Sequence, residues 1–346
     1  MGTQEFALDV DTVRPYLRQQ GLIADSTSIK ATELGGGISN VVVLVEGQGI
    51  RWVVKQSLGK LRVKEDWHSD RNRIFREAQA LQVLGELLGP AAVPDVIYVD
   101  REHYVFIMSA APAEAAPWKD LLLRGRVDLA VARQVGTLLA RVIKNSHDNP
   151  HLRDQFHDRR IFDQLRIGPY YRTVASRDPS VRMVMQDLIS DSWNTRISIV
   201  HGDYSPKNIL VDRNQILLID CEVVHWGDPA FDAGFLLTHL FLKAIHKPKD
   251  ARSYLAAALA FWKALERGLG VMATGQFARL TIRHLGGLML ARIDGKSPVE
   301  YLVDEKSREQ ARTIAKRILL GPPSSLSELA DSVVKELWVG RMHGSD

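Results

Sequence analysis

Two acidic segments in the second half of the chain contain the residue types that phosphoryl transfer requires. The first, IVHGDYSPKNILV at 199–211, places Asp203 and Asn208 five residues apart between two apolar runs. The second, ILLIDCEVV at 216–224, places Asp220 at the end of an apolar strand. Phosphoryl transfer needs a carboxylate that accepts the proton of the incoming hydroxyl, and oxygen ligands that hold Mg²⁺. The pattern indicates Asp203 as general base and Asn208 and Asp220 as magnesium ligands.

The first segment also has a structural interpretation. Asp, Asn, Ser and Pro are common turn residues, so Asp203 and Asn208 in isolation fit a plain loop equally well. The second acidic segment, a short distance on, favours the catalytic interpretation. If the runs at 208–212 and 215–219 form a hairpin, it brings Asp203, Asn208 and Asp220 to one end.

A lysine within an apolar strand is a further candidate. Lys55 lies in RWVVKQ at 51–56, where burying an unpaired ammonium would cost several kcal/mol. Glu77, on the apolar helix predicted at 69–88, is a suitable partner. In the functional interpretation Lys55 holds nucleotide phosphates and Glu77 positions it. The alternative is an exposed edge-strand lysine and a surface glutamate.

A glycine-rich segment precedes the lysine strand. It runs Leu34-Gly35-Gly36-Gly37-Ile38-Ser39-Asn40, and its glycines would let backbone N–H groups approach phosphates. A plain turn is the alternative, and the functional interpretation rests on the position of the segment ahead of Lys55. The GxxxxGK[ST] pattern of P-loop enzymes is absent.

The elements that must position these residues divide into two sets. Strands are predicted at 28–34, 41–47, 51–56, 96–100 and 103–108, with helices at 8–20 and 69–88. Helices then dominate, from 128–147 and from about 230 onward, interrupted by short strands at 198–200, 208–212 and 215–219. We therefore predict an α+β protein with a β-rich N-terminal lobe at 1–108, a linker at 109–117 and a helical C-terminal lobe at 118–346.

Together these motifs resemble the aminoglycoside phosphotransferase and choline kinase superfamily. The resemblance rests on VHGDYSPKNILV, LLIDCEVVHWGDPAFDAGF and the Lys55–Glu77 pair. It implies a bilobal protein-kinase-like fold, ATP and Mg²⁺ as cofactors, and an adenine-binding hinge at 108–111 that includes Met108 and Ala110. It also implies that Asp232 braces the catalytic loop.

The N-terminal lobe is most similar to that of the methylthioribose kinases. The similar segments are GGGISNVVVLV and WVVKQSLGKLRVKEDWHSDRNRIFREAQAL. Asp220-Cys221-Glu222 resembles the DxE metal motif of those kinases and makes Glu222 a third metal candidate. The chain differs from them in keeping Asn208 and in carrying only Ala291-Arg292 in place of a late twin-arginine pair.

The acceptor is left open by the sequence. A methylthioribose-like sugar, an aminoglycoside, choline or ethanolamine, and homoserine are the alternatives, as is a kinase-like module that binds nucleotide without turnover. Arg283, His284 and Arg292 on a late helix could contact a substrate or form solvated surface. Carboxylates or aromatic rings around the pocket would favour a cationic acceptor.

Composition and charge bear on nucleic-acid binding, membrane insertion and cellular location. The 346 residues carry 45 basic and 41 acidic side chains, spread along the chain without a basic block, so nucleic-acid binding is not expected. The lack of a long apolar run predicts no membrane span. A single cysteine, Cys221, and an N-terminus without an apolar signal core fit a cytoplasmic enzyme. A homodimer is compatible with the sequence.

Overall fold

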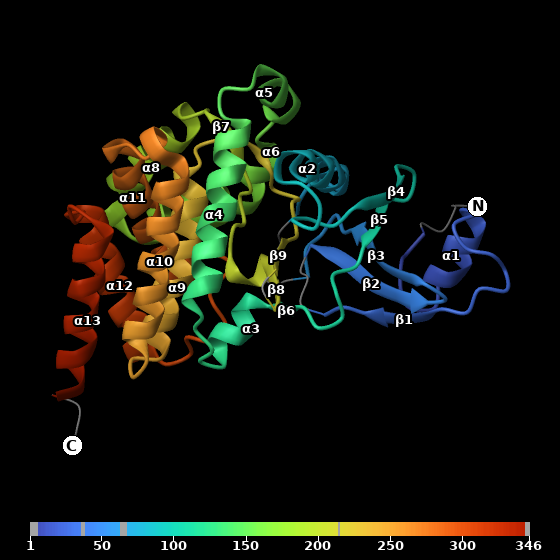
Figure 1. The fold of residues 1–346 in the computed structure, drawn as a ribbon. Helices are drawn as coiled ribbons and strands as arrows, with labels where there is room; N and C mark the ends of the chain where they lie inside the picture. Colours follow the sequence, from blue (N-terminus) through green and yellow to red (C-terminus); the bar gives the residue numbers. More distant parts are fainter. Residues whose placement is uncertain (1–5, 36–38, 63–67, 214, 343–346) are drawn as a thin grey trace. The chain divides into compact units, whose positions relative to one another are not determined.

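The computed structural model describes residues 6–35, 39–62, 68–213 and 215–342. The chain forms two compact units, which Figure 1 colours by sequence; they are Met1–Glu114 with Leu217–Val223, and Ala115–Ile216 with Val224–Asp346. The fold class is α+β, as predicted.

The division differs from the predicted domains at one segment. Leu217–Val223 was assigned to the helical lobe from the sequence, but it folds with the first unit. The Leu218 N–H donates to the Ala92 carbonyl at 2.9 Å, and the acidic residues that follow pair with side chains of the same unit. The second acidic segment therefore belongs with Lys55.

The first unit is built on an antiparallel five-stranded sheet of order β1-β2-β3-β5-β4. Its strands are β1 (Lys30–Glu33), β2 (Asn40–Gly47), β3 (Ile50–Ser57), β4 (Val96–Asp100) and β5 (Val105–Ser109). Alternation along β3 sends neighbouring side chains to opposite faces. Val54 joins the apolar cluster on one face, whereas Lys55 reaches Glu77 on the other.

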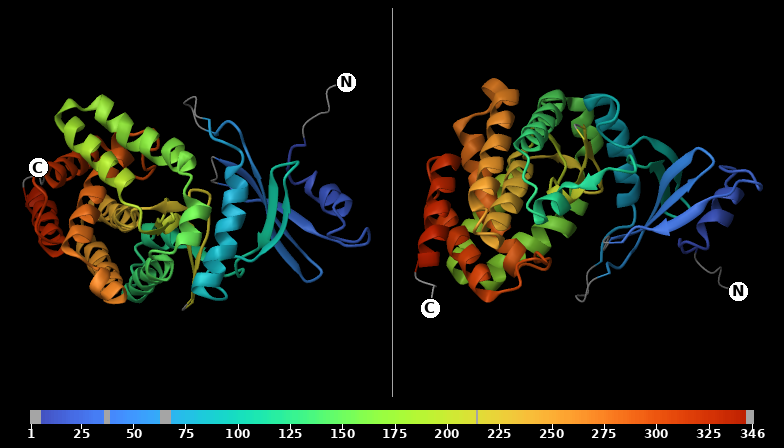
Figure 2. Two further views of the ribbon diagram at one scale, coloured as in Figure 1. Left: turned by 90° about the horizontal axis from the view of Figure 1, so that it is seen from above. Right: turned by 60° about the horizontal axis from the view of Figure 1, so that its bottom comes forward.

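A helix covers each face of this sheet, as the left view of Figure 2 shows. Helix α1 (Val13–Gln19) packs Val13, Tyr16 and Leu17 into the apolar cluster with the valines of β2. Helix α2 (Arg73–Leu88) lies on the lysine face. Both helices are shorter than predicted, because the residues before them form turns; for example, Asp9 Oδ1 accepts the N–H groups of Asp11 and Thr12.

The second unit is mostly helical. Its α-helices are α3 (Trp118–Leu123), α4 (Leu129–Ser146), α5 (Pro150–Phe156), α6 (Arg160–Phe162), α7 (Thr173–Arg177), α8 (Arg182–Asn194), α9 (Ala230–His246), α10 (Ala251–Leu269), α11 (Gly275–Asp294), α12 (Glu305–Leu320) and α13 (Leu326–Met342). Helix α10 packs against α4, α9 and α13, and α11 against α9 and α12. Gly136 permits a close approach of α4 to α10, since a Cβ there would lie 2.3 Å from the Phe261 carbonyl oxygen.

Short strands and tighter or wider turns interrupt the helices. They are β6 (Ala116–Pro117), β7 (Ser198–Val200), β8 (Ile209–Asp212), β9 (Gln215–Leu218), β10 (His225–Gly227), the π-helix η1 (Asp163–Arg172), and the 3₁₀ turns η2 (Pro179–Val181), η3 (Pro206–Asn208) and η4 (Gly270–Met272). β6, β8 and β9 form one small sheet, and β10 pairs with β7 in another. The sequence did not predict β10.

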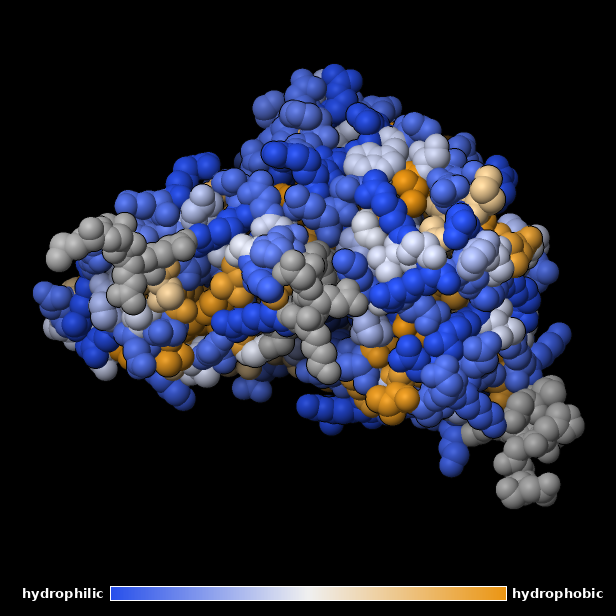
Figure 3. All heavy atoms as spheres, turned by 180° about the vertical axis from the view of Figure 1, so that it is seen from behind, coloured by the Kyte–Doolittle hydropathy of each residue, from blue (hydrophilic) through white to orange (hydrophobic). Residues whose placement is uncertain are grey.

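The surface is polar over most of the face drawn in Figure 3, where apolar residues form small separate patches. Among the described helices, none has the length and apolarity needed to cross a bilayer. Cys221 is buried.

Candidate active site

A buried cluster of charges in the first unit is centred on Lys55. Its ammonium lies 2.7 Å from both carboxylate oxygens of Glu77 and 3.1 Å from Asp220 Oδ1. Lys55 and Glu77 are almost completely buried, with 4% and 0% of their surface exposed. This overturns the alternative of a solvated lysine and a surface glutamate. The exposed part of the cluster is Asp220, whose side chain is 23% exposed.

The backbone at Asp220 is strained. Its φ is +64°, in the left-handed region, which costs roughly 1–2 kcal/mol for a residue with a Cβ. Strain of this kind persists where surrounding contacts hold the residue in place, and it concentrates at functional sites. Here the contact with Lys55 is one such restraint.

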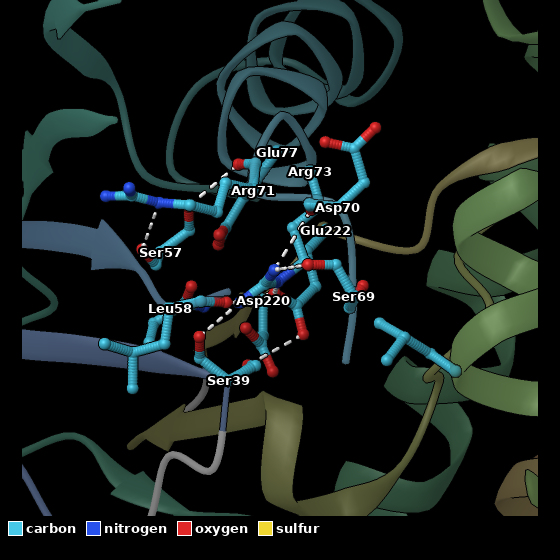
Figure 4. Close-up of polar contacts among 12 residues, drawn as sticks. Ser39, Ser57, Leu58, Ser69, Asp70, Arg71, Arg73, Glu77, Asp220 and Glu222 are labelled. Carbon is cyan, nitrogen blue, oxygen red and sulfur yellow. Dashed lines mark hydrogen bonds and ion pairs between the residues drawn. The ribbon is translucent and has the colours of Figure 1, made fainter. Parts of the chain in front are cut away.

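Glu222 ties the segment after the glycines to helix α2, as Figure 4 shows. Ser39 Oγ donates to Glu222 Oε1 at 2.9 Å, and Asn40 Nδ2 donates to Oε2 at 3.1 Å. Arg73 Nε donates to the same Oε2 at 3.2 Å. Ser39 and Asn40 were predicted as nucleotide-binding residues, and both lie beside this carboxylate. The predicted Gly36 and Gly37 lie outside the described residues, and Gly35 is exposed.

Arg73 is a central residue that the sequence prediction missed. It has no exposed surface, and besides Glu222 it donates to the backbone carbonyls of Ser39, Leu58 and Asp70. Because it also sits four residues before Glu77 on α2, the two side chains share a helix face. The signal that the sequence offered was an arginine four residues before Glu77, which is the spacing of neighbours on one helix face.

Electrostatics keep this lysine charged. Burial alone would lower the pKa of Lys55, but the carboxylates of Glu77, Asp220 and Glu222 outweigh it and raise that pKa. A permanent buried ammonium with one partly exposed carboxylate partner is suited to binding phosphate oxygens.

The carboxylates also fit the donor set of a divalent cation. One oxygen each from Glu77, Asp220 and Glu222 lie within 4.8 Å of one another, and oxygen ligands are those that Mg²⁺ selects. Both oxygens of Glu77 accept hydrogen bonds from Lys55, and both oxygens of Glu222 accept hydrogen bonds from Ser39, Asn40 and Arg73. The more exposed Asp220 is therefore the candidate with the most accessible carboxylate.

The predicted hinge residues occupy the end of the sheet. Met108 is buried on β5, opposite Val53 of β3. The Ala110 N–H donates to the Arg51 carbonyl at 2.9 Å. Sheet pairing therefore fixes the backbone on both sides of Ser109.

A second cluster, within the helical unit, surrounds Asp203. Asn208 Nδ2 donates to the Asp203 carbonyl at 2.9 Å and to Asp203 Oδ2 at 2.8 Å. The side chains of Arg166 and Lys207 each lie 3.0 Å from the same Oδ2. Three donor side chains thus hold Asp203, and the amide oxygen of Asn208 has no hydrogen bond in the described part of the chain.

Asp232, at the start of α9, holds the backbone of this loop. Its carboxylate accepts the His201 N–H at 2.6 Å and the Gly202 N–H at 2.8 Å. Burial raises the pKa of Asp232 to about 7, against the lowering effect of these two donors. The geometry matches the bracing role that the family resemblance implies.

Arg166 was also missed by the sequence prediction. It lies on η1, a π-helix that contains Pro169, and such wide turns are common at functional sites. Its Nε donates to the Gly202 carbonyl at 2.7 Å. No periodic pattern in DQLRIGPYYR signalled this element, because a π-helix departs from the 3.6-residue repeat.

The late-helix residues Arg283, His284 and Arg292 form side-chain contacts and are not simply solvated surface. His284 is fully buried on α11, with Nδ1 2.7 Å from the Tyr171 hydroxyl and Nε2 3.3 Å from Asp228. Arg283 pairs with Asp191 at 2.5 Å. Arg292 is half-buried and donates to the Tyr170 hydroxyl at 3.3 Å.

Comparison with known proteins agrees with this geometry. The phosphotransferase enzyme family matches residues 30–273. A methylthioribose kinase of Pectobacterium atrosepticum is 27% identical over 277 residues, covering 70% of this chain and 68% of the relative. One from Bacillus cereus is 22% identical over 280 residues, covering 72% and 70%.

A solved structure resembles the fold. It is a spectinomycin phosphotransferase in complex with ADP and spectinomycin, 11% identical, with a TM-score of 0.52 and coverage of 94% of this chain and 98% of the other. At this identity the likeness concerns the fold alone. The family match spans both the Lys55 and the Asp203 clusters, and the chain belongs to the phosphotransferase enzyme family, as an ATP-dependent small-molecule kinase.

Proposed function

We propose that the chain transfers the γ-phosphoryl group of ATP to a hydroxyl of a small metabolite, with Asp203 as general base. The observation that carries this proposal is the almost completely buried Lys55 ammonium, hydrogen-bonded to Glu77 and Asp220. A buried ion pair is weak as a stabilising device, so its presence favours a role in binding the nucleotide phosphates. The Asp203–Asn208 contact supplies the second half of the machinery.

Each residue has a stated role in the reaction. The acceptor oxygen attacks the γ-phosphorus, the bond from that phosphorus to the β–γ bridging oxygen breaks, and ADP leaves. Asp203 takes the hydroxyl proton, while Lys55 neutralises phosphate charge. Asp220 and Asn208, with Glu222, would hold Mg²⁺, which when bound neutralises charge on the phosphates. Catalysis then rests mainly on positioning and electrostatics.

The acceptor class follows from the relatives only in part. Their names make a methylthioribose-like sugar one candidate acceptor. Aminoglycosides, choline or ethanolamine, and homoserine are the alternatives.

The test is ADP release from ATP and Mg²⁺ across a panel of these acceptors. Asp203→Asn should lower kcat by roughly 10²-fold or more, because it removes the base, with little change in the KM for ATP. Asp331→Asn, at an exposed site on α13, is the matched control and should keep full activity. Turnover retained by Asp203→Asn would refute the assignment of the base.

A further inference from the structure

Several buried hydrogen-bond donors in the helical unit lack a full set of acceptors among the described residues. Lys243 on α9 has 1% of its surface exposed. Its ammonium lies 3.5 Å from the His239 carbonyl and 4.9 Å from the centre of the Tyr301 ring. Among the described residues, no carboxylate forms an ion pair with it. An ammonium can donate three hydrogen bonds, and burying one without a counter-charge costs several kcal/mol.

Two neighbours of Lys243 add to this surplus. The Tyr301 hydroxyl and the Arg292 Nε are buried and have no hydrogen-bond partner within the described residues. Burial lowers the pKa of Lys243 to about 7, and the nearby charges of Lys119 and Arg292 lower it while Glu300 raises it. Glu300, the carboxylate that raises this pKa, is itself paired with Lys119. We call Lys119, Lys243, Arg292 and Tyr301 the donor cluster.

Side chains on one face of α9 lead from the donor cluster towards Asp203. Phe235, His239 and Lys243 recur every four residues on α9, so they share one face of the helix, spanning about 12 Å of its length. Phe235 lies 5.2 Å from His239 and 5.9 Å from the Arg166 guanidinium, measured to ring centres. Arg166 in turn contacts Asp203 at 3.0 Å.

Arg292 provides a second connection. Its guanidinium lies 5.9 Å from the centre of the Tyr170 ring, and that of Arg166 lies 5.5 Å from the same ring. Burial would raise the pKa of Tyr170, yet the charges of Arg292 and Arg166 lower it overall. Two guanidinium groups therefore lie near the Tyr170 ring, and one of them contacts Asp203. A cationic acceptor would be repelled here, and an anionic one attracted.

We propose that the donor cluster binds a carboxylate or phosphate group of the acceptor, so that the substrate is a hydroxylated anion of sugar size. This inference rests on the proposed function for the identity of the reaction. The hydroxyl is phosphorylated at Asp203 as described above, and the anionic group lies at the far end of the Phe235–Lys243 row. The buried Lys243 ammonium then gains its counter-charge when the substrate binds.

The experiment measures binding by calorimetry, so that it does not depend on turnover. The probes are ribose, ribonate and ribose 5-phosphate, which share a skeleton and differ in having no anion, a carboxylate or a phosphate; choline is the cationic probe. We expect one of the two anionic probes to bind at least 10-fold more tightly than ribose, and the tighter one identifies the source of the charge. Equal affinities for all three sugars, or tighter binding of choline, would overturn the proposal.

Two variants test the residue assignment. Lys243→Met should weaken binding of the preferred anion at least 10-fold while raising the melting temperature, because it removes a buried ammonium that has no counter-charge. Tyr301→Phe should weaken the same binding without unfolding the protein. Lys263→Met, at an exposed site on α10, is the matched control. Unchanged affinity in Lys243→Met would refute its role.

A separate measurement distinguishes failure of the proposed kinase function from failure of the anion site. Thermal stabilisation by ATP with Mg²⁺ reports the nucleotide site alone. If ATP fails to stabilise the protein while ribonate or ribose 5-phosphate binds through Lys243, the kinase proposal fails and the anion site stands. If ATP stabilises the protein and the anions bind no better than ribose, the anion-site proposal fails and the nucleotide site stands.

Discussion

The buried Lys55–Glu77 pair gives a prediction whose size can be worked from the structure. Breaking a buried ion pair costs about 3–5 kcal/mol, because the remaining charge is left without its partner. In Glu77→Gln, Lys55 keeps Asp220 at 3.1 Å, so the loss should fall at the low end. In Lys55→Met, the fully buried Glu77 keeps two nearby carboxylates and loses its cation. That variant should therefore lie at the high end.

The assay is thermal unfolding followed by circular dichroism or calorimetry. At roughly 3 °C per kcal/mol, the two single variants should lower Tm by about 10 °C and about 15 °C. The double variant Lys55→Met/Glu77→Gln should be more stable than Lys55→Met alone, since no buried charge is left at either position. Lys60→Met, on the chain after β3, serves as a surface control, its site being exposed.

The pH dependence supplies a further check on the same pair. Burial raises the pKa of Glu77, and Lys55→Met removes the ammonium that opposes this effect. The folded variant then holds a proton that the unfolded chain releases above the ordinary value of 4.5. Its stability should fall as pH rises, so the Tm deficit is smaller at pH 6 than at pH 8. Additive single losses, or a deficit that shrinks as pH rises, would refute the reasoning.

Three other outcomes are expected. Asp232→Asn removes one of the two carboxylate oxygens that hold the catalytic loop, so kcat should fall about 10-fold or more while the KM for ATP stays constant; an unchanged kcat would argue against bracing. Because the pKa of Lys243 is lowered to about 7, the ammonium is lost as pH rises, and the Kd of the preferred anion should increase by up to about 10-fold per unit between pH 7 and 9. A flat calorimetric profile would contradict this. Tyr204→Phe removes the buried hydrogen bond to the Val135 carbonyl and should cost about 1 kcal/mol of stability with kcat intact, as denaturant unfolding and ADP release would show.

The sequence by itself determined the strands, the main helices and the residue types of the reaction. Alternation in VVVLV and RWVVKQ defines strands because one face of a sheet is buried, and burial shows in residue type. Lys55 could be recognised because an ammonium in such a run needs a partner. Asp203, Asn208 and Asp220 could be proposed as site residues because their side-chain types are those that phosphoryl transfer requires.

Only the tertiary structure decided which of these residues pair. Ser39, Arg73 and Glu222 are far apart in the chain and meet because the Leu217–Val223 segment folds with the first unit. Local patterns carry no information about such long-range contacts. Arg166 reaches Asp203 through a π-helix, whose period differs from the one that sequence patterns detect.

The donor cluster, too, could not be predicted from local sequence patterns. Lys243 lies in LTHLFLKAIH in the last turn of a largely apolar helix, a position that favours a basic residue through the helix dipole. The surroundings of the buried Lys243 include Tyr301, Arg292 and Lys119, which come from other parts of the chain. That its ammonium lacks a carboxylate partner among the described residues is therefore decided by the fold. The sequence determined the reaction class, because that depends on residue types at short spacing. The charge preferred in the acceptor depends on which side chains the fold leaves without partners.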